Sequence, residues 1–185
     1  MKKLIVIEGM DRSGKDTLIQ SLIRTLPNCL VTHWGSAKGS TDAEKKANQQ
    51  QFFADQMETW QYLQSSPIDP QHLIWNRAHL GEYVYGTIYR DTQPDTWVPQ
   101  LEEEYLMGDN VYMIYLCGTP EFLLRNDDGE SFTVDIAQKT QEANAFLEAF
   151  QKSRVNRKLL VVVDNVTDYR PKAEILDQVL RFINS

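Results

Sequence analysis

Gly9-Met-Asp-Arg-Ser-Gly-Lys-Asp-Thr17 is the stretch of sequence that decides the fold. An apolar run of strand type at residues 4–7 precedes it, and a helical pattern at residues 16–26 follows it. A strand, a glycine-rich loop and a helix, in this order, are the context in which this spacing of glycines and lysine marks a phosphate-binding loop. Backbone N–H groups in such a loop surround an anion, and the helix N-terminus adds a positive partial charge. The stretch therefore predicts a site for nucleotide phosphates.

One position departs from the usual pattern of this motif. Lys15 stands where the side chain reaches the β- and γ-phosphates, but Asp16 follows it where a hydroxyl is expected, and the hydroxyl comes at Thr17. The displaced hydroxyl needs an explanation. The candidate ATP-binding residues of the loop are Gly9, Asp11, Arg12, Ser13, Gly14, Lys15, Asp16 and Thr17.

Length, composition and charge indicate one globular domain over residues 1–185. The net charge of −7 argues against a nucleic-acid polymer or an anionic membrane surface as partner. The apolar run near the N-terminus is too short for a signal peptide, and no run approaches transmembrane length. Cys29 and Cys117 have no metal-binding or redox spacing. A reducing, cytoplasmic setting is the expectation.

Strand-like and helical patterns alternate along the chain. Apolar, β-branched runs occupy residues 4–7, 29–32, 111–116 and 159–163, with a weaker run at 72–75. Continuous apolar runs are typical of strands buried on both faces of a parallel sheet. Helical patterns lie between and after them, at residues 16–26, 41–63, 82–89, 97–107, 120–124, 134–153 and 171–183. The order predicts a doubly wound α/β domain.

The segment Glu8-Gly-Met-Asp-Arg-Ser-Gly-Lys15 resembles the phosphate-binding loop of thymidylate kinases of the eukaryotic and viral type. The resemblance implies the P-loop nucleoside monophosphate kinase fold, a five-stranded parallel sheet flanked by helices. It also implies Mg²⁺ and ATP as the phosphoryl donor, and a deoxynucleoside monophosphate as acceptor. In that family the residue matching Asp11 holds the sugar 3′-hydroxyl, and the one matching Arg12 reaches the transferred phosphoryl group. An arginine there can compensate the charge of the equatorial oxygens, although a solvated Asp11–Arg12 ion pair stays open.

Trp75-Asn76-Arg77 follows the weaker strand, where the family carries Asp-Arg. Ligands bind at the carboxyl ends of strands in such folds, and Arg77 can clamp the acceptor phosphate with two hydrogen bonds. A surface ion pair is the alternative for Arg77. The family's aspartate helps to order magnesium, but this chain has Asn76 there and an extra carboxylate at Asp16. We therefore expect the two positions to exchange roles, with Asp16 and Asn76 as the candidate metal residues. The alternatives are that Thr17 or water holds the metal, or that the site is impaired.

The acceptor is expected to contact two further segments. Residues 81–86, Gly-Glu-Tyr-Val-Tyr-Gly, look like members of the family encoded by bacteriophages. In this segment Glu82 can hold a sugar hydroxyl or a basic group, a solvated acid being the alternative, and Tyr85 can line the pocket. Phe52 and Gln56 share a helical face one turn apart, matching an aromatic residue and an arginine that contact the base in the family. Core packing is the alternative for Phe52.

Residues 124–133 occupy the position of the lid in this family. Kinases close a lid to exclude water, which would otherwise compete as the nucleophile. Arg125 is the only arginine in this segment and is expected to contact ATP. The candidate catalytic residues are thus Arg12, Lys15, Arg77 and Arg125.

The sequence favours a deoxynucleoside monophosphate kinase that acts on thymidylate or another pyrimidine deoxynucleotide. A deoxynucleoside kinase is the first alternative, although the chain has His33 and no glutamate at the end of the second strand, where those enzymes carry their base. A catalytically weak nucleotide-binding relative is the second alternative. The expected partners are nucleotide substrates, and a homodimer is expected from the resemblance alone.

Overall fold

The computed structural model describes residues 1–35, 38–90, 92–129, 131, 133–165 and 167–185. Its centre is a five-stranded sheet in the order β2-β3-β1-β4-β5, and every pairing between neighbouring strands is parallel. The strands are β1 (Lys3–Gly9), β2 (Cys29–His33), β3 (His72–Asn76), β4 (Val111–Cys117) and β5 (Arg157–Val162). The predicted α/β class and all five predicted strands are confirmed.

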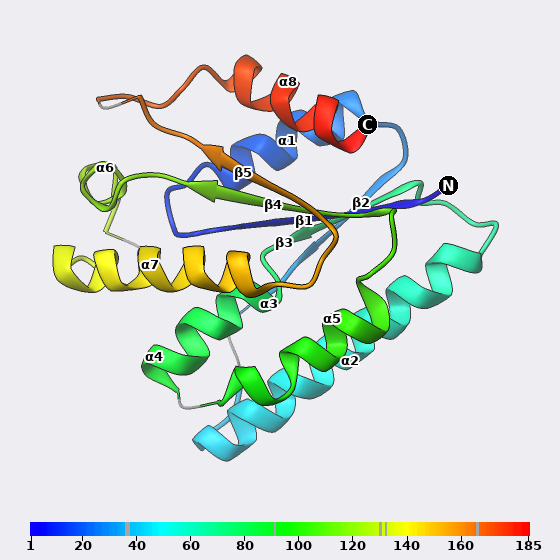
Figure 1. Cartoon of the computed structure of the whole chain (residues 1–185), viewed down its shortest axis with the longest axis horizontal. Coiled ribbons are helices and arrows are strands. Elements are labelled where there is room, and N and C mark those ends of the chain that lie inside the picture. Colours follow the sequence, from blue (N-terminus) through cyan, green and yellow to red (C-terminus); the bar gives the residue numbers. More distant parts are fainter. Residues whose placement is uncertain (36–37, 91, 130, 132, 166) are drawn as a thin grey trace.

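Helices cover both faces of this sheet (Figure 1). One face carries α1 (Lys15–Thr25) and α8 (Lys172–Ile183). The opposite side carries α2 (Asp42–Ser65), α5 (Val98–Tyr105) and α7 (Ile136–Lys152). Shorter helices complete the chain: α3 (His79–Gly81), α4 (Thr87–Tyr89), α6 (Pro120–Arg125) and the 3₁₀-helix η2 (Pro94–Thr96). None of the helices in the described part of the chain combines the length and hydrophobicity needed to span a lipid bilayer.

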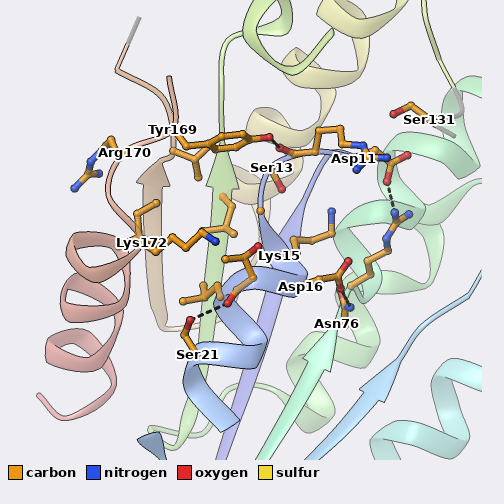
Figure 2. A pocket seen from close by; sticks show the side chains of 18 of the residues that line it. Asp11, Ser13, Lys15, Asp16, Ser21, Asn76, Ser131, Tyr169, Arg170 and Lys172 are labelled. Carbon is orange, nitrogen blue, oxygen red and sulfur yellow. Dashed lines mark hydrogen bonds and ion pairs between the residues drawn. The ribbon is translucent and has the colours of Figure 1, made fainter. Parts of the chain in front are cut away.

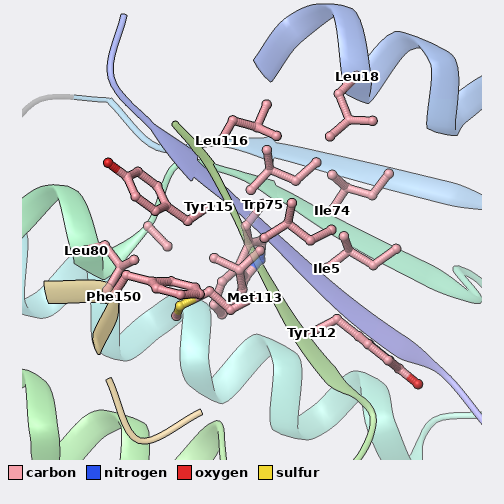
Figure 3. Close-up of a cluster of buried hydrophobic side chains, with 14 of the residues drawn as sticks. Ile5, Leu18, Ile74, Trp75, Leu80, Tyr112, Met113, Tyr115, Leu116 and Phe150 are labelled. Atoms are coloured by element: carbon pink, nitrogen blue, oxygen red, sulfur yellow. The ribbon is translucent and has the colours of Figure 1, made fainter. Parts of the chain in front are cut away.

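The core forms because the central strands are apolar on both sides. In β1, the side chains of residues 4–7 have no exposed surface. Figure 3 shows Ile5 and Ile74 of adjacent strands on the face of the sheet toward Leu18 of α1, and Met113 on the other face near Phe150 of α7. Each such fully buried side chain contributes about 1.5–3 kcal/mol relative to an exposed one. The core therefore stabilises the strand order, and the functional residues can lie at the strand ends.

Parallel pairing brings the carboxyl ends of the central strands to one edge. Ile7 of β1 is level with Asn76 of β3, which is level with His33 of β2. Gly9, at the end of β1, is level with Leu116 of β4. The phosphate-binding loop, Asn76 and Arg77 therefore meet at this edge although they are far apart in sequence.

The sequence predicts one helix over residues 82–89, but the chain forms a π-helix there, η1 (Glu82–Gly86), between α3 and α4. A side chain at Gly86 would collide with the Thr92 hydroxyl and the Glu82 carboxylate, so the absence of Cβ lets these groups meet across the turn. Single turns of π-helix inside α-helices often occur at functional sites. This turn forms one wall of the second cavity described below.

The N-terminus of α2 is set by a capping box. The Thr41 hydroxyl accepts a hydrogen bond from the Glu44 N–H at 3.2 Å, and the Glu44 carboxylate accepts one from the Thr41 N–H at 3.1 Å. Of the cap candidates at residues 40–42, the structure thus selects Thr41. The cap fixes which side chains of α2 face the sheet edge.

Candidate functional site

The phosphate-binding loop joins β1 to α1 and has the backbone that its glycines allow. Gly9 has φ +150°, and a Cβ there would collide with the Leu116 carbonyl and the Ser13 side chain. Arg12 and Gly14 also have positive φ angles, of 65° and 85°. Gly14 caps α1, so the loop ends where the free N–H groups of the helix begin. This is the geometry that surrounds an anion with backbone donors.

Lys15 lies inside this loop and is 6% exposed. Its Nζ donates hydrogen bonds to the carbonyl oxygens of Gly9, at 2.9 Å, and Met10, at 2.7 Å. Burial, and after it the nearby Arg77 guanidinium, lower the pKa of Lys15 to about 8, against the opposing effect of Asp11 and other carboxylates. A phosphate in the loop offers the ammonium group a charged acceptor in place of two neutral ones.

A cavity of about 670 Å³ opens from the loop toward α8 (Figure 2). Its polar part holds the loop residues 11–17 together with Asn76 and Arg77. Its apolar part is lined by Leu18, Leu116, Val163, Tyr169 and Ile175. Figure 2 shows Tyr169, Arg170 and Lys172 on the side of the loop away from Asp16 and Asn76. The cavity thus offers a phosphate site and an adjoining apolar surface, as a nucleotide requires.

Asp16 and Asn76 are in direct contact at the edge of this cavity. Asn76 Nδ2 donates a hydrogen bond to Asp16 Oδ1 at 2.7 Å. Asn76 Oδ1 is buried and has no hydrogen-bond partner among the described residues. In the described part of the chain, no group of three His, Cys, Asp or Glu side chains is placed to hold a metal. A carboxylate oxygen beside an unpaired amide oxygen fits Mg²⁺, which binds few protein oxygens and keeps several waters.

Arg77 and Asp11 form an ion pair between β3 and the loop. The backbone of Arg77 has φ 68°, and its N–H donates to the Ile7 carbonyl at 2.9 Å, so the residue is turned back against β1. Both side chains are only partly exposed, at 34% and 23%. The predicted alternative of an Asp11–Arg12 pair is wrong, because Asp11 faces Arg77 and Arg12 pairs with Asp128 instead.

A second cavity, of about 390 Å³, lies on the other side of this ion pair. Asp11 and Arg77 line both cavities. The walls of the second cavity come from the end of β1, from α2 and from the segment after β3, and its lining includes Glu8, Trp34, Lys45, Gln49, Ala78, Gly81, Glu82, Tyr85, Tyr89, Arg90 and Phe146. Two sites that share one ion pair are the arrangement needed to pass a group between two ligands.

The predicted residues Glu82 and Tyr85 line this second cavity, but Phe52 and Gln56 do not. The α2 residues that line this cavity are instead Lys45 and Gln49. Phe52 packs edge-on against Trp34, with ring centroids 5.2 Å apart, as its core-packing alternative predicts. The part of α2 that lines the cavity therefore lies nearer the N-terminus of the helix than the predicted pair.

Glu82 is buried and holds a basic group, one of its two predicted roles. Its carboxylate accepts hydrogen bonds from Arg90 Nη2 at 2.8 Å and from the Thr92 hydroxyl at 2.6 Å. Sequence reasoning missed Arg90 and Thr92. The sequence held no clear signal for them, because the eight-residue separation of Glu82 and Arg90 is not the spacing of three or four residues at which side chains pair on a helix.

A carboxylate from the sheet itself also lines the second cavity. Glu8 is 1% exposed, and one of its carboxylate oxygens accepts the Leu80 N–H at 3.0 Å. Burial raises the pKa of Glu8, although nearby His79 and cationic side chains oppose this effect. Glu8 was part of the predicted loop motif but had no predicted role.

Of the predicted lid segment, residues 124–133, the structure describes residues 124–129, 131 and 133. Asp128 pairs with Arg12, and Ser131 lines the first cavity. Arg125 does not line that cavity; its Nη2 donates to the Thr167 carbonyl at 2.6 Å. Contact between Arg125 and ATP therefore stays a prediction.

Comparisons with known proteins give the fold its family context. The sequence matches no protein-family model and no curated protein sequence. Among solved structures, YorR of Bacillus subtilis in complex with phosphorylated GDP superposes with a TM-score of 0.69 at 14% identity, over 98% of this chain and 96% of that one. Thymidylate kinase from Candida albicans gives a TM-score of 0.68 at 18% identity, over 99% and 91%.

Deoxyadenosine kinase from M. mycoides with bound dATP gives a TM-score of 0.56 at 12% identity, over 99% of this chain and 100% of that one. Identities this low establish the architecture and leave the reaction to be argued from the site. The chain has the α/β fold of P-loop nucleotide kinases, with a five-stranded all-parallel sheet flanked by helices.

Proposed function

We propose that this chain transfers the γ-phosphate of ATP to a deoxynucleoside monophosphate, with thymidylate and other pyrimidine deoxynucleotides as the first substrates to test. The observation that carries the proposal is the pair of cavities joined at Asp11 and Arg77. Phosphoryl transfer depends mainly on positioning two ligands in line and on neutralising charge between them. The proposal gives the donor the cavity of the phosphate-binding loop and gives the acceptor the second cavity.

The residues of the first cavity suit the donor. Backbone N–H groups of the loop and the N-terminus of α1 bind the phosphates, and Lys15 Nζ bonds the β- and γ-oxygens. Arg12 has to leave Asp128 to reach the transferred group, where its charge stabilises the equatorial oxygens. Asp16 and Asn76 would hold Mg²⁺, whose charge offsets that of the phosphate oxygens.

The residues at the junction suit the acceptor. When the acceptor binds, its phosphate pairs with the Arg77 guanidinium, and its sugar hydroxyl donates a hydrogen bond to the Asp11 carboxylate. Both charged groups then keep a partner, so the ion pair opens without leaving a partly buried charge unpaired. The acceptor phosphate already carries its nucleophilic oxygen, and the reaction needs no general base. The lid segment excludes water from the transfer.

The deoxynucleoside kinase alternative has one supporting observation. A nucleoside hydroxyl needs a general base, and Glu8 is a carboxylate of raised pKa that lines the second cavity. The end of β2, however, offers His33 and no carboxylate.

Release of ADP from ATP distinguishes the proposals when it is measured with each of the four deoxynucleosides and each of their 5′-monophosphates. We expect ADP release to depend on a monophosphate and to be faster with pyrimidine than with purine monophosphates. Dependence on nucleosides alone would establish the alternative, and no acceptor-dependent release would leave a nucleotide-binding protein without this activity. Lys15→Ala is the control, because a contaminating kinase would be unaffected by it.

A further inference from the structure

We propose that Arg90 is a second phosphate-binding residue of the acceptor cavity, acting beside Arg77, and that Glu82 and Thr92 position it for this role. The proposal rests on the proposed function and adds to it the group that makes the cavity prefer a monophosphate over the corresponding nucleoside. It starts from two arginines that line the same cavity of about 390 Å³.

Arg90 is largely buried and incompletely paired. Its side chain is 18% exposed, and Nη2 donates to Glu82 Oε2 at 2.8 Å. Its Nε is buried with no hydrogen-bond partner among the described residues, and the same holds for Arg77 Nε. A buried donor left unsatisfied costs about 1–3 kcal/mol. Phosphate oxygens, like carboxylate oxygens, match the geometry of a planar guanidinium group and can accept from its free donors.

Arg90 is held in place by a set of contacts around η1. Glu82 is 1% exposed in its side chain and accepts the Thr92 hydroxyl at 2.6 Å on its other oxygen. The position of Thr92 is fixed in turn by its N–H, which donates a hydrogen bond to the Gly86 carbonyl at 3.0 Å. Trp97 Nε1 donates to the Thr92 carbonyl at 3.3 Å. An arginine held this firmly loses little conformational entropy when a ligand binds.

The charges of the cavity show why a second arginine is needed. Arg77 is already balanced by Asp11, and Lys45, which also lines the cavity, pairs with Asp42 at 3.1 Å. A phosphate dianion that meets only Arg77 would keep one charge uncompensated near the buried Glu8 carboxyl. A second guanidinium lines the same cavity, and although Glu82 balances its charge through Nη2, its Nε is left to donate a hydrogen bond to a phosphate oxygen. Monophosphates gain from this arrangement, whereas nucleosides have no group that can use it.

Calorimetric titration of the full chain, without ATP, tests the proposal. The probes are the four deoxynucleoside 5′-monophosphates and the matching nucleosides, on wild type, Arg90→Met and the control Arg181→Met. Arg181 is exposed on α8 and pairs only with Asp177 among the described residues. A charge-assisted hydrogen bond contributes about 1.5–3 kcal/mol, so Arg90→Met should weaken monophosphate binding by about tenfold to a hundredfold. Nucleoside binding should stay within about twofold of wild type, and Arg181→Met should change neither.

A purely structural role of the Glu82–Arg90 pair gives a different result. The thermal midpoint would fall while the ratio of monophosphate to nucleoside affinity stayed constant, and this outcome would overturn the proposal. Because Arg90→Met leaves the buried Glu82 without its cation, the double variant Glu82→Gln/Arg90→Met removes both charges and should show the same selective loss. Normal ADP release with an unchanged monophosphate KM in the variants would reject the role of Arg90 and leave the proposed function intact. Absence of ADP release in wild type would reject the proposed function.

Discussion

Asp16, the first residue after the loop lysine, accepts a 2.7 Å hydrogen bond from Asn76 at the end of β3. The two positions that depart from the pattern of the thymidylate kinases that the loop resembles, one by gaining a carboxylate and one by losing it, are therefore neighbours in space. A carboxylate at either position can serve the same metal ion, since both face the same edge of the first cavity. This contact is what an exchange of roles between residues 16 and 76 requires.

If the roles are exchanged, Asp16→Ala should lower magnesium-dependent turnover about a hundredfold, comparable to removing one strong electrostatic contact in an active site. Moving the carboxylate back, in the double variant Asp16→Ser/Asn76→Asp, should recover most of the loss. Calorimetry of ADP with and without Mg²⁺ gives a readout apart from turnover, because Asp16→Ala should remove the gain in affinity from the metal. Asp177→Ala, at an exposed position of α8, is the control. Wild-type turnover of Asp16→Ala at limiting Mg²⁺ would contradict the exchange.

The Arg12–Asp128 ion pair predicts an effect on ATP affinity. Both side chains are partly exposed, at 33% and 48%, so the pair contributes at most about 1 kcal/mol. Asp128→Asn removes the competitor for Arg12 and should tighten ATP binding by up to about fivefold. Fluorescence titration with an ATP analogue measures this change. Weaker ATP binding in Asp128→Asn would show that the lid aspartate assists the nucleotide.

Removing Arg12 itself should act on the chemical step. Arginines that meet the transferred phosphoryl group account for about 10³–10⁵ in kcat. We expect Arg12→Met to lower kcat by at least about a hundredfold with less than a threefold change in the KM for ATP. Steady-state kinetics at saturating acceptor separates the two parameters. An equal loss in both nucleotide affinity and turnover would indicate a role in ground-state binding.

The buried pair of His79 and Glu102 predicts how stability depends on pH. His79 Nε2 lies 2.6 Å from Glu102 Oε1, and that carboxylate also accepts the Ser153 hydroxyl at 2.6 Å and the Arg154 N–H at 2.8 Å. Burial alone would raise the pKa of Glu102, but His79 and these hydrogen bonds bring it below its ordinary value of 4.5. The unfolded chain therefore binds the proton more readily. The stabilisation from Glu102 is present above pH 4.5 and is lost as the pH falls through the lower pKa of the folded state.

Urea unfolding at several pH values checks this relation with a matched pair of variants. Glu102→Gln should lower the free energy of unfolding at pH 7 by about 1–3 kcal/mol, because it replaces the buried acceptor of the His79, Ser153 and Arg154 contacts with an amide that satisfies them less well. The difference from wild type should shrink in acid. The neighbouring Glu103 forms an exposed pair with Arg154, so Glu103→Gln should change the free energy by about 1 kcal/mol or less. Similar effects of the two variants would contradict a special role for the buried carboxylate.

Local patterns in the sequence were enough to predict the sheet and the loop. The apolar run before Gly9 and the glycines around Lys15 act through their own backbone, so β1, the loop and α1 follow from adjacent residues. Parallel strands then bring Asn76 to the loop without further information, because their carboxyl ends share one edge. The contact between Asp16 and Asn76 could be anticipated for this reason.

The positions of the Arg90 and Arg125 side chains depend on tertiary contacts and could not be predicted from the sequence. Arg90 reaches the second cavity through its contact with Glu82 of η1, which also accepts the Thr92 hydroxyl, and Thr92 in turn donates its N–H to the Gly86 carbonyl. Arg125 turns to the Thr167 carbonyl and away from the first cavity because the segment after β5 offers an acceptor there. Neither arrangement follows from periodicity, since each depends on partners that are distant in sequence or not helical.

The position of α2 gives the last prediction, which concerns the base. Gln49 is 8% exposed and lines the second cavity, whereas Gln56, two turns further along α2, does not. A glutamine amide can both donate to and accept from a base edge, and the apolar substitution Gln49→Leu loses both functions. We expect Gln49→Leu to raise the acceptor KM at least about tenfold and to reduce discrimination among bases, while Gln56→Leu stays within about twofold of wild type. Kinetics with the four deoxynucleoside monophosphates compares the variants, and a larger effect at Gln56 would restore the contact inferred from sequence and require α2 to move when the acceptor binds.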